Sequence, residues 1–422
     1  MKTKQQINKV LNNSFSFALI KKGIVTVCSI AFVSLLSRYL GPTLKGEYST
    51  YMSCSSILVI ILQMGFFKLY PYYKRNHPEE SCKDVFFSIS IFKAVIFGLV
   101  VLLFLGVFEK YKINTLFPIT VLLNMLQGEC LFLVLVDNIK YQNIISIVIY
   151  LLNVVDILAL FLFAEPKVSY VFIVLIIRDV VAVVLSIIYM KYRLIISKRL
   201  LSTLTELLGN SIFPVIAALL VEMNYRVDVI FLNKLTDDYL VGLYATGVQL
   251  AEMAWMIPDV FKEVLFNKTA KSDSVDKVCF SLRIAITTVI LCLIGIVLLG
   301  KPIIYLLFGE DYMSAYAVTM LIFIGVPFMA IFKVLNPLIQ ARGEWKIYIF
   351  TLLMAVLSNV VLNLIMIKMM GMPGAAVASI VSYSIAGVSM LIYFIKKFKV
   401  KIRDCIFINK EDVVRIRSFI KS

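Results

Sequence analysis

The sequence is poor in the side chains that most catalytic and metal sites use. It has one histidine, His77, and none of its cysteines shows metal-ligand spacing or a pairing pattern. We find no Walker P-loop, no GxSxG elbow and no HExxH motif. These absences argue against a zinc enzyme, a serine hydrolase and an ATPase that works without a partner chain. We therefore expect no metal site, no structural disulfide and no enzymatic activity. The seven cysteines are Cys28, Cys54, Cys82, Cys130, Cys279, Cys292 and Cys405.

Charged residues are also scarce. They make up 16% of the 422 residues, whereas hydrophobic residues make up 61%, and the mean hydropathy is +0.92. These values lie far outside those of soluble globular proteins. Apolar runs of about 20 residues recur along the chain, which is the length a helix needs to cross about 30 Å of hydrocarbon. The ten-residue alternation of a membrane strand is missing. The composition therefore predicts an all-α polytopic membrane protein.

The apolar runs divide the chain into about twelve predicted transmembrane helices. A basic, amphipathic stretch interrupts them at 191–210. It is too polar to cross and predicts a cytoplasmic interfacial linker helix between two domains. We expect an N-terminal six-helix bundle at 1–190, a C-terminal six-helix bundle at 211–395 and a basic cytoplasmic tail at 396–422. The predicted spans lie near 15–37, 49–70, 85–108, 115–136, 143–164, 168–190, 211–233, 240–261, 281–299, 315–339, 347–367 and 374–395.

The second half of the chain repeats the first weakly. The stretch LGPTLKGEYSTY after the first span corresponds to LTDDYLVGLYATG after the seventh, and each contains Gly, one residue, then Tyr. Asn153 in the fifth span likewise corresponds to Asn359 in the eleventh. An even number of spans in each half gives both halves the same orientation. We therefore expect two bundles that form a parallel pseudo-two-fold repeat around a central cleft.

The net charge of +16 raises the question of a nucleic-acid partner, but the positions of the charges favour membrane topology. If the N-terminus is cytoplasmic, most of the 42 Lys and Arg residues fall on the cytoplasmic side. This distribution follows the positive-inside rule and predicts that both termini are cytoplasmic. The basic tail then contacts anionic membrane lipid, and we expect no nucleic acid among the partners.

Ionisable residues also lie inside the predicted spans. Each costs about 2.5–3.5 kcal/mol at a helix centre, so such residues usually face a bundle interior or a wet cavity. The candidate cations are Lys21, Lys22, Lys93, Arg178, Arg226 and Lys333. The candidate acids are Asp156, Glu222, Asp228, Glu252 and Asp259. Amide side chains that could contact a polar substrate are Gln127, Asn153, Gln249, Asn359 and Asn363.

The spacing of these residues suggests partners for some of them. Arg226 follows Glu222 by one helical turn, so it either neutralises that carboxylate or contacts a substrate. Lys333 lies in the middle of its span, where snorkelling is difficult, and we expect it to face the lumen.

Two further pairs lie close together in the sequence. Arg178 and Asp179 are adjacent, so they point to different faces of a helix and we expect them to have separate partners. Asn359 and Asn363 share one face, and interhelical hydrogen bonds are their expected role.

One segment resembles a known family. NYRVDVIFLNKLTDDYLVGLYATGVQLAEMAWMIP, from Asn224 to Pro258, is similar to the middle of Wzx-type polysaccharide flippases of the O-antigen and capsule pathways. These belong to the MATE-like multidrug/oligosaccharidyl-lipid/polysaccharide exporter superfamily. GEDYMSA at 309–315 and the region from Asn359 through Asn363 to GMPGAAVAS at 371–379 also match. The residues that fit the main pattern are Arg226, Asp228, Gly242, Tyr244, Glu252 and Pro258.

The resemblance implies a transporter of the bacterial inner (cytoplasmic) membrane. It would flip an undecaprenyl-diphosphate-linked oligosaccharide repeat unit to the outer leaflet for surface polysaccharide synthesis, by alternating access through a cation-lined lumen. The in-span cations would bind the diphosphate, and the amides would contact the sugars. The acids would either couple transport to H⁺ or Na⁺ or pair with the cations. No other cofactor is implied, and the implied protein partners are a polysaccharide polymerase and glycosyltransferases.

Three other functions compete with this interpretation. A MATE-like cation-coupled drug antiporter would have an acidic lumen, and the in-span Lys and Arg residues count against it. A lipid II-type flippase would share the fold and the carrier lipid. A membrane polymerase or ligase acting on the same carrier would show a long external loop, whereas the predicted external loops are short.

Overall fold

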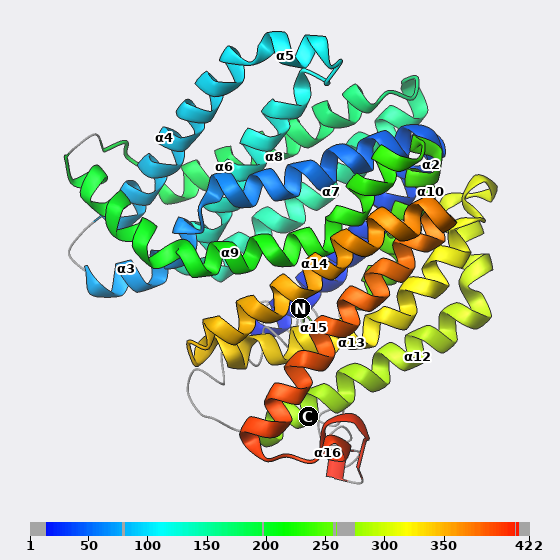
Figure 1. The fold of residues 1–422 in the computed structure, drawn as a ribbon. Coiled ribbons are helices and arrows are strands. Elements are labelled where there is room, and N and C mark those ends of the chain that lie inside the picture. The colour runs from blue at the N-terminus through cyan, green and yellow to red at the C-terminus, as the bar shows by residue number, and fades with distance from the viewer. Residues whose placement is uncertain are drawn as a thin grey trace, which may run out of the picture. The chain divides into compact units, whose positions relative to one another are not determined.

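The computed structural model describes residues 14–77, 81–195, 198–255, 259, 275–409 and 411–412. Within these residues the chain is helical between short connections, and no strand occurs (Figure 1). Ten of the described helices are long and apolar enough to cross a membrane, judged by length and composition. The prediction of an all-α polytopic membrane protein is therefore confirmed.

The chain forms two compact units. The first unit comprises residues 1–44 and 54–219, and the second comprises 45–53 and 220–422. Helix α2 contributes to both units, and so does α9. The elements that begin in the first unit are α2 (Ser14–Gln63), η1 (Phe66–Leu69), α3 (Tyr70–Asn76), α4 (Cys82–Leu103), α5 (Leu105–Lys110), α6 (Leu116–Asp137), α7 (Ile139–Phe163), α8 (Val168–Met190) and α9 (Lys198–Leu235).

The second unit is organised around α15. This helix packs against α13 and α14, and α13 also packs against α10 and α12. The short helix α16 packs on α12. The elements that begin in this unit are α10 (Asp238–Glu252), η2 (Met253–Trp255), α12 (Val275–Phe308), η3 (Glu310–Tyr312), α13 (Ala315–Ala341), α14 (Trp345–Met370), α15 (Met372–Phe398) and α16 (Ile402–Ile406).

Helix α2 contains two of the predicted spans. Its apolar stretch covers 43 residues. At 1.5 Å per residue this is about 65 Å, roughly twice the thickness of the hydrocarbon. The helix is broken at Gly41, where φ is 65° and ψ is 170°, and Pro42 follows. Glycine adopts positive φ without a Cβ clash, so the Gly-Pro pair ends the first span, as its sequence indicates.

Helix α9 differs from the expected arrangement. The sequence predicts a separate linker helix at 191–210. In the structure, α9 runs from Lys198 to Leu235 and stays helical through Pro214. Leu207 is 2% exposed and belongs to a core cluster with Phe66 and Tyr70 in the first unit. Near Leu207, one face of α9 therefore packs on this unit, and the division between the units falls within the helix, at 219/220.

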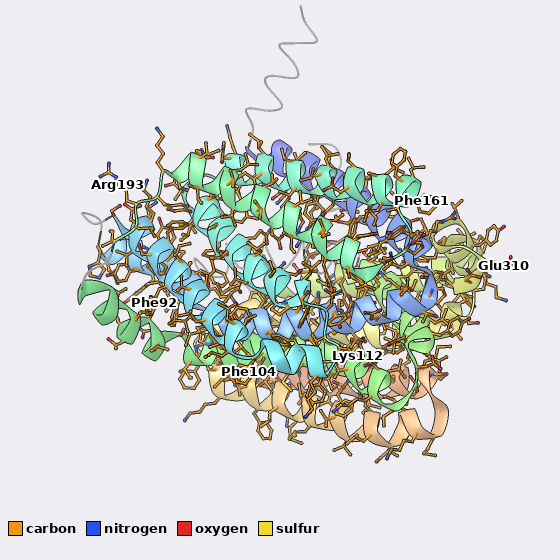
Figure 2. All side chains as sticks on the ribbon, turned by 90° about the horizontal axis from the view of Figure 1, so that it is seen from above. Phe92, Phe104, Lys112, Phe161, Arg193 and Glu310 are labelled. Atoms are coloured by element: carbon orange, nitrogen blue, oxygen red, sulfur yellow. The ribbon has the colours of Figure 1, made fainter. Side chains whose placement is uncertain are left out.

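Large apolar side chains cover the outside of the spans. Phe92 of α4 is 47% exposed and Phe161 of α7 is 44% exposed. Both lie at the periphery of the first unit in Figure 2. A soluble protein rarely exposes contiguous apolar surface of this kind. In a membrane protein such side chains contact lipid, so the exposed faces agree with the hydropathy of the spans.

Helices α13 and α15 approach each other very closely. A Cβ atom added at Gly387 of α15 would overlap the backbone carbonyl of Phe328 in α13. Small residues at helix contacts allow this kind of close packing in membranes. This contact fixes α15 against α13, the two helices that carry Tyr383 and Lys333.

Candidate functional site

The second unit holds a partly buried cluster of charged and aromatic residues that includes Arg226, whose side chain is 33% exposed. Arg226 and Glu222 are one turn apart on α9, and the Nε of Arg226 lies 3.2 Å from Oε1 of Glu222. The Nη1 of Arg226 lies 3.5 Å from Oε1 of Glu252 at the end of α10. The guanidinium therefore links two helices and neutralises two carboxylates. The i,i+4 spacing reveals the first contact, whereas the second depends on how α9 and α10 pack.

Lys333 of α13 forms the second cationic centre. Its Nζ lies 3.0 and 3.1 Å from the two carboxylate oxygens of Asp259. The same Nζ lies 4.4 Å from the ring centroid of Trp255 and 5.8 Å from that of Tyr225. An ammonium over aromatic rings is attracted by their electron-rich faces. The lysine side chain is 12% exposed, so a carboxylate and two rings replace most of its water.

Three rings form what we call the aromatic cluster: Tyr225 of α9, Trp255 of η2 and Tyr383 of α15. The ring centroids of Tyr225 and Trp255 are 5.0 Å apart, and those of Trp255 and Tyr383 are 5.8 Å apart. The Nε1 of Trp255 and the hydroxyl of Tyr383 are buried and have no hydrogen-bond partner among the described residues. Buried donors nearly always have partners. These two are available to a polar ligand that reaches the cluster.

Asp228 is held by hydroxyl groups instead of a cation. It is 1% exposed, and the hydroxyl of Tyr244 donates to its Oδ2. The hydroxyl of Ser379 donates to the same oxygen at 2.9 Å. One turn earlier on α9, Asn224 accepts a hydrogen bond from Ser382. These bonds join α9 to α10 and α15. The carboxylate and hydroxyl oxygens around Asp228 are also the ligand type that small hard cations prefer.

The structure corrects the expectation for Asn359 and Asn363 of α14. The Nδ2 of Asn363 donates to the backbone carbonyl and to Oδ1 of Asn359, at 2.9 and 2.7 Å. These two bonds therefore run along one helix, not between helices, because i and i+4 side chains meet on the same face. The Nδ2 of Asn359 and the Oδ1 of Asn363 are buried without a hydrogen-bond partner.

The charge balance of this site is acidic. The two cations, Arg226 and Lys333, stand against four carboxylates, which gives a net charge of −2 if all groups are ionised. Each cation is already paired, so a ligand anion has to compete with a carboxylate for it. Among the described residues, no group of three or more His, Cys, Asp or Glu side chains could hold a metal ion. The four carboxylates belong to Glu222, Asp228, Glu252 and Asp259.

The first unit holds a separate buried ion pair. Lys93 of α4 pairs with Glu129 of α6 and also donates to the backbone carbonyl of Gln63 at 3.1 Å. The two side chains are 10% and 2% exposed. The Nζ of Lys93 lies 5.3 Å from the ring centroid of Phe66. This environment satisfies the lysine within its own unit.

Arg178 and Asp179 of α8 are partners of each other. The Nε of Arg178 lies 2.6 Å from Oδ1 of Asp179. Asp179 is therefore a partner of Arg178, and the prediction that the two residues have separate partners is wrong for this pair. A long arginine side chain can fold back across the 100° between neighbouring positions on a helix, which the backbone directions alone do not show.

The remaining candidates are distributed over both units. In the first unit, the Oδ1 of Asn153 and the Oδ2 of Asp156 on α7 are buried without a hydrogen-bond partner. They are therefore polar groups available to a ligand. The other candidates are partly exposed: Lys21 and Lys22 at the start of α2, Gln127 on α6 and Gln249 on α10.

Sequence reasoning did not select the aromatic cluster as a site. Trp255 is one of only two tryptophans in the chain, and it lies inside a predicted span instead of at its edge. That position was an available signal, because tryptophan usually lies at the membrane interface. Ser379 and Ser382 share one face of α15 at i,i+3, which was a weaker signal.

Buried ion pairs within apolar spans are typical of membrane transporters. The sequence matches no family model and no curated protein. Solved structures, however, share its fold. The lipid II flippase MurJ in an inward closed conformation matches with a TM-score of 0.74 and 14% identity, covering 92% of this chain and 88% of that one.

Two further structures support the same fold. An inward-facing multidrug-resistance MATE transporter of the MOP superfamily matches with a TM-score of 0.68 and 10% identity, covering 90% and 98%. A MOP-superfamily transporter from Pyrococcus furiosus, described as having a binding pocket of reversed polarity, matches with a TM-score of 0.66 and 11% identity, covering 93% and 96%. The chain therefore has the fold of MOP-superfamily transporters.

Proposed function

We propose that the protein is a flippase that moves an undecaprenyl-diphosphate-linked oligosaccharide from the cytoplasmic to the outer leaflet for surface polysaccharide synthesis, such as that of O-antigen or capsule. The observation that carries the proposal is the position of Lys333 beside the aromatic cluster, whose Trp255 Nε1 and Tyr383 hydroxyl have no hydrogen-bond partner within the part of the chain that the structure describes. Sugars bind aromatic faces and hydrogen-bond donors, while a diphosphate binds Lys and Arg. The polyprenyl tail can remain in lipid.

The ion pairs suggest how binding and release would be coupled. In our proposal the diphosphate takes the place of a carboxylate on Arg226 or Lys333. The displaced carboxylate of Glu252 or Asp259 then takes up H⁺ or Na⁺, because a carboxylate that loses its cation in a partly buried site is costly. Movement of the two bundles would expose the site to each side of the membrane in turn.

The proposal includes the cellular setting. It places the protein in the bacterial inner membrane with both termini in the cytoplasm, supported by the distribution of Lys and Arg. A polysaccharide polymerase would use the flipped product, and glycosyltransferases would supply the substrate. The contacts of Lys93 with Glu129 support a structural role for this cation, so we assign diphosphate binding first to Arg226 and Lys333.

A second candidate is a MATE-like cation-coupled drug antiporter. The observation that favours it is the excess of carboxylates in the second unit, which would attract a cationic compound. A lipid II-type flippase is a variant of the first proposal with a different sugar unit. The fold accommodates all three, so the substrate has to be tested directly.

The test uses a strain that lacks this gene. Lipid-linked oligosaccharides are labelled with lectins or cleaved with glycosidases in intact spheroplasts and, for comparison, in lysed ones. We expect them to accumulate where only lysis gives access, and expression of the intact chain to restore outer-leaflet labelling. Unchanged outer-leaflet labelling together with new sensitivity to cationic dyes would reject the flippase and support the antiporter.

A further inference from the structure

Two buried cysteines of the second unit lie side by side. The Sγ atoms of Cys279 in α12 and Cys405 in α16 are 3.9 Å apart. The residues are 4% and 0% exposed. A disulfide has an S–S distance of about 2.05 Å, so a movement of about 2 Å would bring the sulfurs to bonding distance. We propose that this pair is a site of reversible oxidation, whose disulfide locks the C-terminal segment (402–409 and 411–412) onto α12.

The C-terminal segment is already docked when both thiols are reduced. Arg283 lies one turn after Cys279 on α12, and its Nε and Nη2 donate to the two carboxylate oxygens of Asp412 at 2.6 and 2.7 Å. Its Nη1 also donates to the backbone carbonyl of Asp404. Bidentate arginine–carboxylate pairs are strong and fix geometry. The arginine therefore holds Cys405 next to Cys279 before any oxidation occurs.

The environment determines which oxidants can act. Both sulfurs are buried, so a large or charged reagent cannot reach them. A hydroperoxide is small enough to do so. One thiolate attacks the peroxide, which gives a sulfenic acid and releases water. The second sulfur then attacks the sulfenic sulfur, forms the S–S bond and releases the second water. The two thiols lose two electrons and two protons in all, and one hydrogen peroxide is reduced to two waters.

The expected state depends on redox conditions. In a reducing compartment the pair remains as two thiols, in agreement with the expectation that the chain carries no structural disulfide. Under peroxide stress the covalent bond adds to the Arg283–Asp412 pair and prevents the segment from leaving α12. This inference does not depend on the transported substrate.

The first experiment counts thiols in the full-length protein in native membranes. Samples are treated with hydrogen peroxide, denatured and reacted with a maleimide-linked polyethylene glycol that shifts the gel band for each free thiol. We expect loss of two of the seven thiols, recovery with dithiothreitol, and a linked peptide containing Cys279 and Cys405. Cys292→Ser, at another position on α12, should still lose two thiols, whereas Cys405→Ser should not form the linked peptide. Seven free thiols, or a link between other cysteines, would overturn the proposal.

A second experiment tests the docking itself. Asp412→Ala removes the carboxylate that Arg283 binds, so the segment should release and Cys405 in the reduced protein should react with N-ethylmaleimide at least about tenfold faster. Asp404→Ala is the matched control, because the contact there uses the backbone carbonyl and is retained. Pre-oxidation should protect Cys405 in Asp404→Ala, where the two thiols stay adjacent, and should protect it less in Asp412→Ala. Equal rates in Asp412→Ala and Asp404→Ala would show that the ion pair does not hold the thiols together.

Discussion

The ammonium of Lys333 lies 4.4 Å from the ring centroid of Trp255 and simultaneously contacts both carboxylate oxygens of Asp259. It therefore joins the charged and the aromatic parts of the site. A ligand that stacks on the Trp255 ring would therefore also lie next to this charge.

Removal of this charge tests its role in transport. We expect Lys333→Ala to reduce glycan export at least about tenfold, equivalent to about 1.4 kcal/mol of binding. Arg226→Ala should act in the same way. The matched control is Lys301→Ala, since Lys301 is an exposed cation that lies over the ring of Tyr316 on the same unit. Export is measured by outer-leaflet labelling at equal membrane abundance. Normal export by both variants would remove these residues from the site.

Two buried tyrosines differ in their hydrogen bonding and allow stability to be separated from binding. Tyr244 donates to Asp228, whereas the hydroxyl of Tyr383 has no hydrogen-bond partner among the residues that the structure describes. Tyr244→Phe should lower the free energy of unfolding by about 1–3 kcal/mol, because Asp228 loses a donor.

Tyr383→Phe should change stability by less than about 0.5 kcal/mol and should reduce export. Thermal unfolding in detergent and the labelling assay measure the two effects on the same preparations. If Tyr383→Phe exports normally, its hydroxyl does not contact substrate.

The ion pair of the first unit gives a third prediction. Lys93→Met leaves Glu129 buried without its cation and should cost about 3–5 kcal/mol of unfolding free energy. The double variant Lys93→Met/Glu129→Gln removes both charges and should recover most of this loss. Chemical unfolding checks the stability. Export restored together with stability would show a structural pair, whereas a stable but inactive double variant would place Lys93 in the substrate site.

The contact between α13 and α15 gives a fourth prediction. Gly387→Ala introduces a Cβ that overlaps the carbonyl of Phe328, so α15 must move away from α13 and the unfolding temperature should fall. Gly295→Ala on α12 is the control, because nothing lies within 4 Å of its added Cβ. Alanine favours a helix over glycine, so this control should be neutral or slightly stabilising. Similar losses in both variants would contradict the close approach.

The sequence predicts the fold well because the length of an apolar run determines whether a helix can cross a membrane. The sequence predicts the fold less well where the polarity of a segment and its packing against neighbouring elements favour different structures. The polar, amphipathic start of α9 predicts a linker helix separate from the next span, but the helix continues into that span, and its face at Leu207 packs into the core. Whether an amphipathic stretch ends or continues into a span depends on the packing of neighbouring elements, which the local sequence does not contain.

The site is predicted only in part, for a related reason. The contact between Glu222 and Arg226 follows from their spacing, but the contact of Arg226 with Glu252 depends on the packing of two helices. The aromatic cluster combines residues from α9, η2 and α15 that are far apart in the sequence. No periodicity within one helix identifies such a group.

The pairing of Arg283 with Asp412 also has a consequence for biosynthesis. The two residues are 129 positions apart, so at about 5–20 residues per second a ribosome makes the aspartate roughly 6–26 s after the arginine. During that interval α12 carries an arginine that lacks its carboxylate. The second unit therefore acquires this ion pair only after residue 412 has been synthesised.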